Sequence, residues 1–188
     1  MKTRESGMPP EEMWQSFFDP ATTLKKLGLT ADCESVVDFG CGYGTFTIPA
    51  AKLIRGHVCA LDIDPEMIAA TRSNAAALPQ VQVAQRDFLV EGCGLSNESV
   101  DYVMLFNILH AVEASTLLAE ARRALKVGGK LGVMHWNYDA NTPRGPSLEI
   151  RLRPEQCVEL VRQAGFSTGE IVDLPPYHYG FVGTRVGD

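Results

Sequence analysis

The sequence lacks the features of several classes of protein. Its 188 residues contain no apolar run long enough to span a membrane, and residues 1–10 lack the apolar segment of a secretory signal peptide. Five cysteines are present, but no two have the CxxC spacing of a zinc or redox motif, and their number is odd. These absences predict reduced thiols, no bound metal and a cytoplasmic location.

Basic charge is also scarce in this chain. The formal net charge is −6 and the sequence pI is about 5.2, which argues against a broad nucleic-acid interface, because phosphate binding needs a basic face. The local cluster of Arg122, Arg123, Lys126 and Lys130 lies at the end of a predicted helix, where cations stabilise the helix dipole. We therefore expect no nucleic-acid partner.

The chain does contain a regular alternation of predicted strands and helices, within the length of one domain. The predicted strands are 36–39, 57–62, 81–86, 100–106 and 130–136, and the predicted helices between them are 45–54, 65–77 and 113–126. This alternation predicts an α/β fold with a doubly wound parallel sheet. A ligand on such a sheet lies beyond the carboxyl ends of the strands.

The end of the chain adds a helix over 154–164 and two further strands over 169–174 and 179–185. The connection over 175–178 is too short for a parallel crossover, so these last two strands should form an antiparallel hairpin. This turn contains Pro175-Pro176-Tyr177, preceded by Leu174. We interpret it as a turn only.

The beginning of the chain forms a separate helical segment. Residues 11–18 predict a short amphipathic helix, and Asp19-Pro20 predicts the start of a second helix, with Asp as N-cap and Pro in the first turn. We expect residues 1–30 to form an N-terminal helical segment that packs against the edge of the sheet, with a lid over the site as the alternative. Residues 31–188 form the Rossmann-like domain.

A glycine-rich loop, Asp38-Phe39-Gly40-Cys41-Gly42-Tyr43-Gly44, follows the first strand of the sheet and leads into a helix. A dinucleotide fingerprint would need glycine or alanine at the position of Thr45. Asp38 would also repel a pyrophosphate. S-adenosyl-L-methionine has no phosphate and carries a sulfonium and an ammonium group. The loop therefore favours this cofactor over NAD(P), and an NAD(P)-dependent oxidoreductase is the weaker alternative.

Acidic side chains follow the next two strands. Asp62 ends the second strand, where its two carboxylate oxygens can accept the two ribose hydroxyls. Asp87 follows the third strand and can accept the adenine amino group, while Phe88 packs against the adenine ring.

In these motifs the chain resembles the class I S-adenosylmethionine-dependent methyltransferases, in particular the small menaquinone/ubiquinone-biosynthesis-like group. The matching stretches are 36–44, 60–64, 86–88, 100–110 and 120–131, the last with Val127 where proline is usual. The resemblance implies a Rossmann-like seven-stranded sheet in the order 3-2-1-4-5-7-6, with strand seven antiparallel.

The same resemblance implies which residues bind the cofactor. Gly40 and Gly42 would approach its methionine end and Asp38 would organise that end, Cys41 would contribute only its backbone, and Asn107 would border the methyl group. The expected cofactor-binding residues are Asp38, Gly40, Cys41, Gly42, Asp62, Ile63, Asp87, Phe88 and Asn107.

The acceptor is less constrained by the sequence. Methyl transfer mainly requires alignment of the nucleophile, and a general base is needed only if the nucleophile loses a proton. His110 and His135 are the candidate bases, with structural packing as the alternative for each. No acceptor domain is inserted, so we expect a small-molecule methyl acceptor, or a homodimer in which a second subunit shapes the pocket. A non-catalytic, S-adenosylmethionine-binding regulatory protein is the other alternative.

Overall fold

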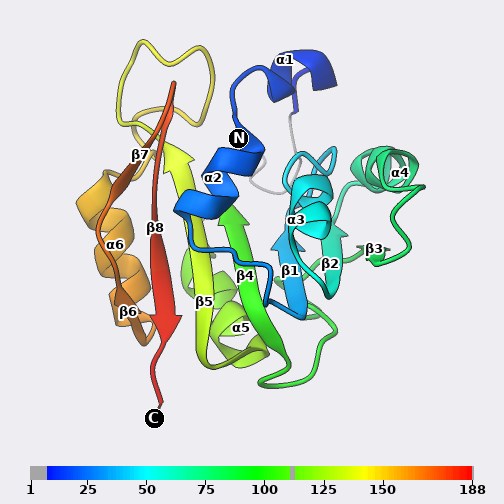
Figure 1. Ribbon diagram of the computed structural model, residues 1–188. Helices are drawn as coiled ribbons and strands as arrows, with labels where there is room; N and C mark the ends of the chain where they lie inside the picture. Colours follow the sequence, from blue (N-terminus) through cyan, green and yellow to red (C-terminus); the bar gives the residue numbers. More distant parts are fainter. Residues whose placement is uncertain (1–7, 111–112, 188) are drawn as a thin grey trace.

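The computed structural model describes residues 8–110 and 113–187 (Figure 1). Its strands are β1 (Ser35–Phe39), β2 (His57–Asp62), β3 (Val81–Gln85), β4 (Val100–Phe106), β5 (Leu125–Trp136), β6 (Phe166–Thr168), β7 (Val172–Leu174) and β8 (His178–Arg185). Its helices are α1 (Glu11–Gln15), α2 (Pro20–Lys26), α3 (Thr47–Leu53), α4 (Pro65–Asn74), α5 (Ala114–Ala124) and α6 (Pro154–Gln163).

The strands form one sheet in the order β3-β2-β1-β4-β5-β8-β6, and β8 runs antiparallel to β5. This confirms the predicted Rossmann-like arrangement. The structure has one strand more than predicted, because β6 and β7 both pair with the same edge of β8. Between them, the segment 169–171 lies opposite only 181–182, so an extra residue interrupts the pairing. The sequence predicted a strand over 169–174. In the structure Gly169, a poor strand former, begins the interruption instead.

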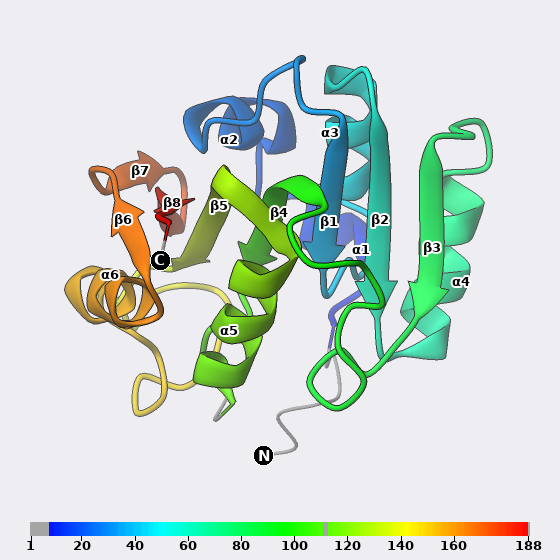
Figure 2. The ribbon, with the colours of Figure 1, turned by 90° about the horizontal axis from the view of Figure 1, so that it is seen from below.

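Helices cover both faces of the sheet, with α2 and α3 on one face and α5 and α6 on the other (Figure 2). The strand residues alternate between two hydrophobic cores, as the two-residue period of a strand requires. Val36 and Met104 pack into the core with α2 and α3, and Val37 and Leu105 pack into the core with α5. The central strands are therefore buried on both sides, and only their ends are available to a ligand.

Two predicted helix starts are confirmed by their caps. The Asp19 carboxylate accepts a hydrogen bond from the backbone N–H of Thr22, and the Asp64 carboxylate accepts one from Glu66. The cap at Asp64 fixes the turn immediately after Asp62 and so helps to place that side chain.

The basic residues at the end of α5 are neutralised by acids. Arg123 pairs with Glu120 at 2.7 Å, and Lys126 pairs with Asp101 at 2.6 Å. The helix ends at Ala124, earlier than predicted, because Leu125 already pairs with β4. Within residues 8–110 and 113–187, no helix is both long and apolar enough to cross a membrane.

Candidate functional site

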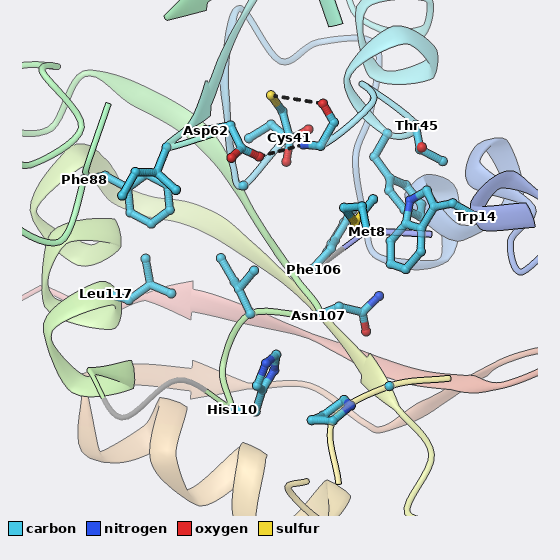
Figure 3. Close-up of a pocket in the computed structure, with 18 of the residues that line it drawn as sticks. Met8, Trp14, Cys41, Thr45, Asp62, Phe88, Phe106, Asn107, His110 and Leu117 are labelled. Atoms are coloured by element: carbon cyan, nitrogen blue, oxygen red, sulfur yellow. Dashed lines mark hydrogen bonds between the residues drawn. The ribbon is translucent and has the colours of Figure 1, made fainter. Parts of the chain in front are cut away.

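A cavity of about 580 Å³ lies beyond the carboxyl ends of β1, β2 and β4 (Figure 3). Its walls come from the loops that follow β1 to β5 and from the segment that precedes α2. All nine residues predicted to bind the cofactor line it: Asp38, Gly40, Cys41, Gly42, Asp62, Ile63, Asp87, Phe88 and Asn107. The fold thus brings together residues from four separate loops.

The glycine-rich loop forms the floor of the cavity below the end of β1. The backbone N–H groups of Gly40 and Cys41 both donate to the Leu61 carbonyl, at 2.8 and 2.9 Å. Gly40 and Gly42 have φ of 76° and 55°, conformations that side chains strongly disfavour. A Cβ at Gly42 would also lie 3.1 Å from the Met8 side chain. Glycine therefore keeps the backbone open to a ligand at this point.

Thr71 of α4 fastens this loop, a role that the sequence analysis missed. Its hydroxyl is fully buried and donates to the Gly42 carbonyl at 2.6 Å, and it lies 3.6 Å from the Cys41 sulfur. Its position, as a polar residue on the buried face of the predicted helix 65–77, was the sequence signal that could have indicated this role. Burial raises the pKa of the Cys41 thiol well above its usual range, so this residue can offer its backbone but not a thiolate.

Asp62 connects the glycine-rich loop to the end of β2. One carboxylate oxygen accepts the Gly42 N–H at 2.9 Å, and the other accepts the Asp64 N–H at 2.9 Å. Burial raises the pKa of Asp62, and these two backbone hydrogen bonds lower it. Each oxygen keeps a further lone pair, so the carboxylate can still accept the two hydroxyls of a ribose.

Asp38 is an almost fully buried carboxylate with a single side-chain hydrogen bond, from Thr47 at 2.6 Å. Burial raises the pKa of Asp38 to about 7; the Thr47 hydrogen bond acts against this rise, and the charge of Asp62 adds to it. A cationic group in the cavity would compensate the desolvated charge. The ammonium group of S-adenosylmethionine fits this requirement, and a pyrophosphate does not.

The side of the cavity that follows β3 combines an aromatic ring, Phe88, with one carboxylate, Asp87. Phe88 contacts Phe39 edge-to-face, with ring centroids 5.0 Å apart, and its ring faces the cavity (Figure 3). The Asp87 carboxylate accepts the Leu89 N–H at 3.2 Å, which fixes it beside this ring. A flat ring with an exocyclic amino group would satisfy both residues.

Three polar atoms of the cavity lining are buried and have no hydrogen-bond partner within the described residues. They are Thr45 Oγ1, Asn107 Oδ1 and His110 Nδ1. Such atoms are rare in folded proteins, so each calls for a partner outside the described residues, and a bound ligand is one such partner. The orphaned atoms and the charge of Asp38 indicate that the cavity is built for a polar ligand with a cationic group.

Asn107 occupies a strained position at the end of β4. Its φ is 60°, which is uncommon for any residue but glycine, and its Nδ2 lies 3.4 Å from His178 Nε2. Burial lowers the pKa of His178 to about 3, so this imidazole is neutral. The pairing orients the Asn107 amide toward the cavity.

The two candidate bases differ in their access to the cavity. His110 lines it, whereas His135 is completely buried behind His110 and is not among the lining residues. Their ring centroids are 5.6 Å apart. Burial and the nearby charge of Arg151 lower the pKa of His110, and burial lowers that of His135 to about 4. Both are neutral at pH 7, and of the two His110 is the one that lines the cavity.

The loop after β5 forms the wall opposite the glycine-rich loop and contributes Arg144, Gly145 and Pro146. Arg151, a residue that the sequence analysis missed, holds this loop together. Its guanidinium is buried and donates to the carbonyls of Asn137 and Pro146, at 2.9 and 2.7 Å. It also donates to the carbonyls of residues 139 and 144 and to the hydroxyl of residue 142.

Replacement of Arg151 by lysine should therefore loosen this wall. A lysine keeps the charge but cannot reach five acceptors, so buried carbonyls would be left unpaired and the free energy of unfolding should fall by about 2 kcal/mol. Urea unfolding followed by tryptophan fluorescence would measure this loss. Arg162→Lys, on the exposed face of α6, is the matched control. Equal stability of the two variants would contradict the role of Arg151.

The Pro-Pro-Tyr segment lies in the turn between β7 and β8, as predicted. The Tyr177 carbonyl accepts the Asn137 N–H at 2.8 Å, and the Tyr177 ring stacks beside Trp136. Tyr177 is not among the residues that line the cavity. This segment supports the wall but does not face the ligand.

Comparison with known proteins agrees with this geometry. Residues 36–129, half of the chain, match the family described as a methyltransferase domain. A protein of Streptomyces fradiae, described as an uncharacterized 37.1 kDa protein in transposon TN4556, is 34% identical over 156 residues, covering 78% of this chain and 45% of its own length. The ribosomal protein L11 methyltransferase of Dechloromonas aromatica is 51% identical over 41 residues, covering 22% of this chain and 14% of its own length.

The chain thus spans less than half the length of these two curated relatives. Among solved structures, an S-adenosylmethionine-dependent methyltransferase from Aquifex aeolicus has a TM-score of 0.82 at 24% identity, covering 95% of this chain and 94% of its own. These similarities do not single out the menaquinone/ubiquinone subgroup, which stays a prediction. They argue against the alternative of an NAD(P)-dependent oxidoreductase, because the family, the fold and the cavity all agree with a methyltransferase domain. The chain therefore belongs to the methyltransferase-domain family.

Proposed function

We propose that this chain is a class I S-adenosylmethionine-dependent methyltransferase and that it transfers the methyl group to a small molecule. The observation that supports this is the shape of the cavity. The side that Asp38, Asp62 and Phe88 leave free is bordered by Trp14 of α1 and by the loop after β5. A concave pocket of about 580 Å³ has the size of a small-molecule site, and it admits a small acceptor more readily than a folded protein or a nucleic acid. The chain's net charge of −6 gives no support to a nucleic-acid acceptor.

The relatives that methylate ribosomal protein L11 suggest a protein acceptor as the alternative. Their similarity is confined to short stretches, 22% of this chain for the Dechloromonas protein. The loop after β5 and the residues before α2 supply the acceptor side of the cavity here. We therefore favour a small-molecule acceptor over a protein acceptor.

We propose the following roles for the lining residues. Asp62 and Ile63 bind the ribose, Phe88 and Asp87 bind the adenine, and the backbone of residues 40–42 with Asp38 binds the methionine end. Asn107 borders the reactive methyl group, and His110 accepts a proton when the acceptor must lose one. The orphaned oxygen of Asn107 and the desolvated charge of Asp38 support these assignments.

Calorimetric titration with S-adenosylhomocysteine tests this function. We expect micromolar binding by the wild type and at least about tenfold weaker binding by Asp62→Ala, because that variant loses both ribose hydrogen bonds and the anchor of Gly42. Glu66→Ala removes an exposed carboxylate in the first turn of α4, and it controls for the loss of charge. Absence of binding by the wild type, or equal affinity of both variants and wild type, would refute the assigned site.

We also propose that the residues before α2 act as a lid. Met8, Pro9 and Trp14 line the cavity, and the Tyr43 hydroxyl donates to the Pro9 carbonyl at 3.0 Å. Helix α1 itself buries no residue, as expected for a cover that can move. Phe17, by contrast, is buried and packs against Trp136, so the lid ends before it.

Deletion of residues 1–15 should therefore spare the fold and weaken the binding of S-adenosylhomocysteine by on the order of tenfold, since the cavity loses one apolar wall. Thermal unfolding and calorimetry of the truncated chain would measure both effects. Unchanged affinity would show that the segment is only a surface cover.

A cytoplasmic location and a monomeric site complete the proposal. All five cysteines are free thiols in the structure, which supports a reducing compartment. One chain supplies every wall of the cavity described here, so a homodimer is not needed to complete it. Light scattering of the purified protein would decide between monomer and homodimer.

A further inference from the structure

Asn107 and His178 meet at the end of β5, although they come from two other strands. Asn107 follows β4, and His178 begins β8 as the register partner of Trp136, so they approach β5 from opposite sides. The Asn107 Nδ2 lies 3.4 Å from His178 Nε2. An amide nitrogen can only donate a hydrogen bond, so the imidazole nitrogen that faces it is the acceptor and carries no proton. The neutral ring therefore holds its proton on Nδ1.

Both partners are held in place by their surroundings. The Asn107 backbone N–H donates to the Met134 carbonyl at 2.8 Å, which fixes the residue across the end of β5. The His178 ring is 1% exposed and packs against Trp136 and Phe18, whose ring centroids are 4.2 and 4.7 Å away. Burial keeps this ring neutral at pH 7, so one of its nitrogens is always free to accept.

The pairing decides which end of the Asn107 amide is left for a ligand. With Nδ2 turned to His178, the remaining atom is Oδ1, which is buried and has no hydrogen-bond partner in the part of the chain that the structure describes. Asn107 lines the cavity (Figure 3), whereas His178 is not among the described residues that line it. His178 can therefore act on a ligand only through Asn107.

The charge of the cofactor agrees with this orientation of the amide. If the Asn107 amide were turned the other way, with Oδ1 accepting from a protonated Nε2 of His178, its N–H groups would point into the cavity. These groups carry partial positive charge, and the sulfonium of S-adenosylmethionine would repel them. A carbonyl oxygen carries partial negative charge, so the same sulfonium attracts it.

We infer that His178 is a positioning residue, which accepts the amide N–H of Asn107 and thereby points the Asn107 carbonyl oxygen at the site of the transferred methyl group. This inference rests on the proposed function, which places Asn107 beside that methyl group. The carbonyl oxygen then supplies a fixed partial negative charge next to the sulfonium before the acceptor arrives. A side chain on β8, outside the cavity, thus sets the polarity of the reactive end.

Sinefungin tests this arrangement, because a carbon that bears an ammonium group replaces the sulfur of S-adenosylhomocysteine and places N–H donors where the methyl group would lie. By calorimetry, the wild type should bind sinefungin about tenfold or more tightly than S-adenosylhomocysteine, since Asn107 Oδ1 accepts one of these N–H groups. His178→Phe and Asn107→Leu should lose this preference. His178→Gln should retain most of it, because the glutamine carbonyl can accept the same amide N–H. A general loss of structure would weaken both ligands together and leave the ratio of the two affinities unchanged.

Phe18→Leu is the matched control, because it removes a ring that packs against His178 and leaves the hydrogen bond in place. It should keep the wild-type ratio, and a lost preference in this variant would show that packing alone sets the ratio, against the inference. Nitrogen-15 NMR of histidine-labelled wild type gives an independent readout. The signals that disappear in His178→Gln should report a protonated Nδ1 and an unprotonated Nε2.

Four results would overturn the inference: a protonated Nε2 of His178, a wild type with no preference for sinefungin, the full preference in His178→Phe, or a folded His178→Gln that behaves as His178→Phe does. If S-adenosylhomocysteine does not bind to the wild type at all, the proposed function fails first. The two failures are therefore distinguishable.

Discussion

Replacement of His110 by alanine should lower kcat by about 10²-fold or more, while the affinity for S-adenosylhomocysteine stays close to that of the wild type. His110 lies at the reactive end of the cavity, and its Nδ1 is buried without a partner in the described structure. The loss would therefore fall on the proton transfer and not on cofactor binding. Single-turnover rates with a responsive acceptor, beside calorimetry, would separate the two quantities.

Two other histidines provide controls for this result. His57→Gln changes an exposed residue at the start of β2, far from the cavity, and should leave kcat unchanged. His135→Gln changes a completely buried residue and should lower stability more than the kcat of the folded enzyme. A loss of kcat in His135→Gln that matches the loss in His110→Ala, with the fold intact, would transfer the role to His135.

The pH dependence of the wild type gives an independent check. Burial and the charge of Arg151 lower the pKa of His110, so the imidazole stays neutral to a lower pH than an ordinary histidine does. The rate constant kcat should fall only as the pH drops through this lowered pKa, when the base becomes protonated. A kcat that is independent of pH in this region would argue that the acceptor needs no base.

The core of the fold could be predicted because its signals are local. Buried strands such as β4 are continuous apolar runs, and Asp-Pro pairs mark the starts of α2 and α4. The glycine-rich loop was equally clear, because each strand and helix fixes which end of the sheet its loop reaches. The lining residues that follow β1 to β4 could thus be named from the order of the elements together with the resemblance to the methyltransferases.

The acceptor side could not be assembled in this way. Arg151 contacts carbonyls spread over 137–146, and nothing in the sequence distinguishes a buried arginine from a solvated one. The pairing of Asn107 with His178 joins positions far apart in the chain and depends on the antiparallel strand β8. These contacts arise from tertiary packing. The burial of His135 does too: the sequence placed this residue at the end of a strand but did not show that its side chain is completely buried.

This division follows the physics of the reaction. The cofactor has one fixed chemistry, so the loops after β1 to β3 must present the same groups in the same places. The acceptor varies between enzymes of one fold, and the elements that contact it are loops and termini that tolerate change. Trp14 and residues 144–146, which line the cavity, lie on such elements.

Replacement of Asp38 by asparagine should stabilise the ligand-free protein at pH 8 and remove a large part of its pH dependence. Burial raises the pKa of Asp38 from 3.8 to about 7, so the folded state binds this proton more tightly than the unfolded state. The stability contributed by the protonated group is complete below pH 4 and is lost as the pH rises to about 7. At about 1.4 kcal/mol per pKa unit, the loss is on the order of 4 kcal/mol.

The amide introduced by Asp38→Asn would keep the hydrogen bond from Thr47 but carry no charge, so the difference in unfolding free energy between variant and wild type should grow from pH 4 to pH 7 and then stay constant. Urea unfolding at a series of pH values measures this difference, and Asp32→Asn, at an exposed position, is the control.

S-adenosylhomocysteine should lower the pKa of Asp38, because its ammonium group would favour the ionised carboxylate. Its binding near pH 6.5 should therefore release a proton from the wild type and none from Asp38→Asn, which calorimetry in buffers of different ionisation enthalpy would detect. Parallel pH profiles of the two proteins, or equal proton release, would show that Asp38 is ionised before the ligand arrives and does not face its ammonium group.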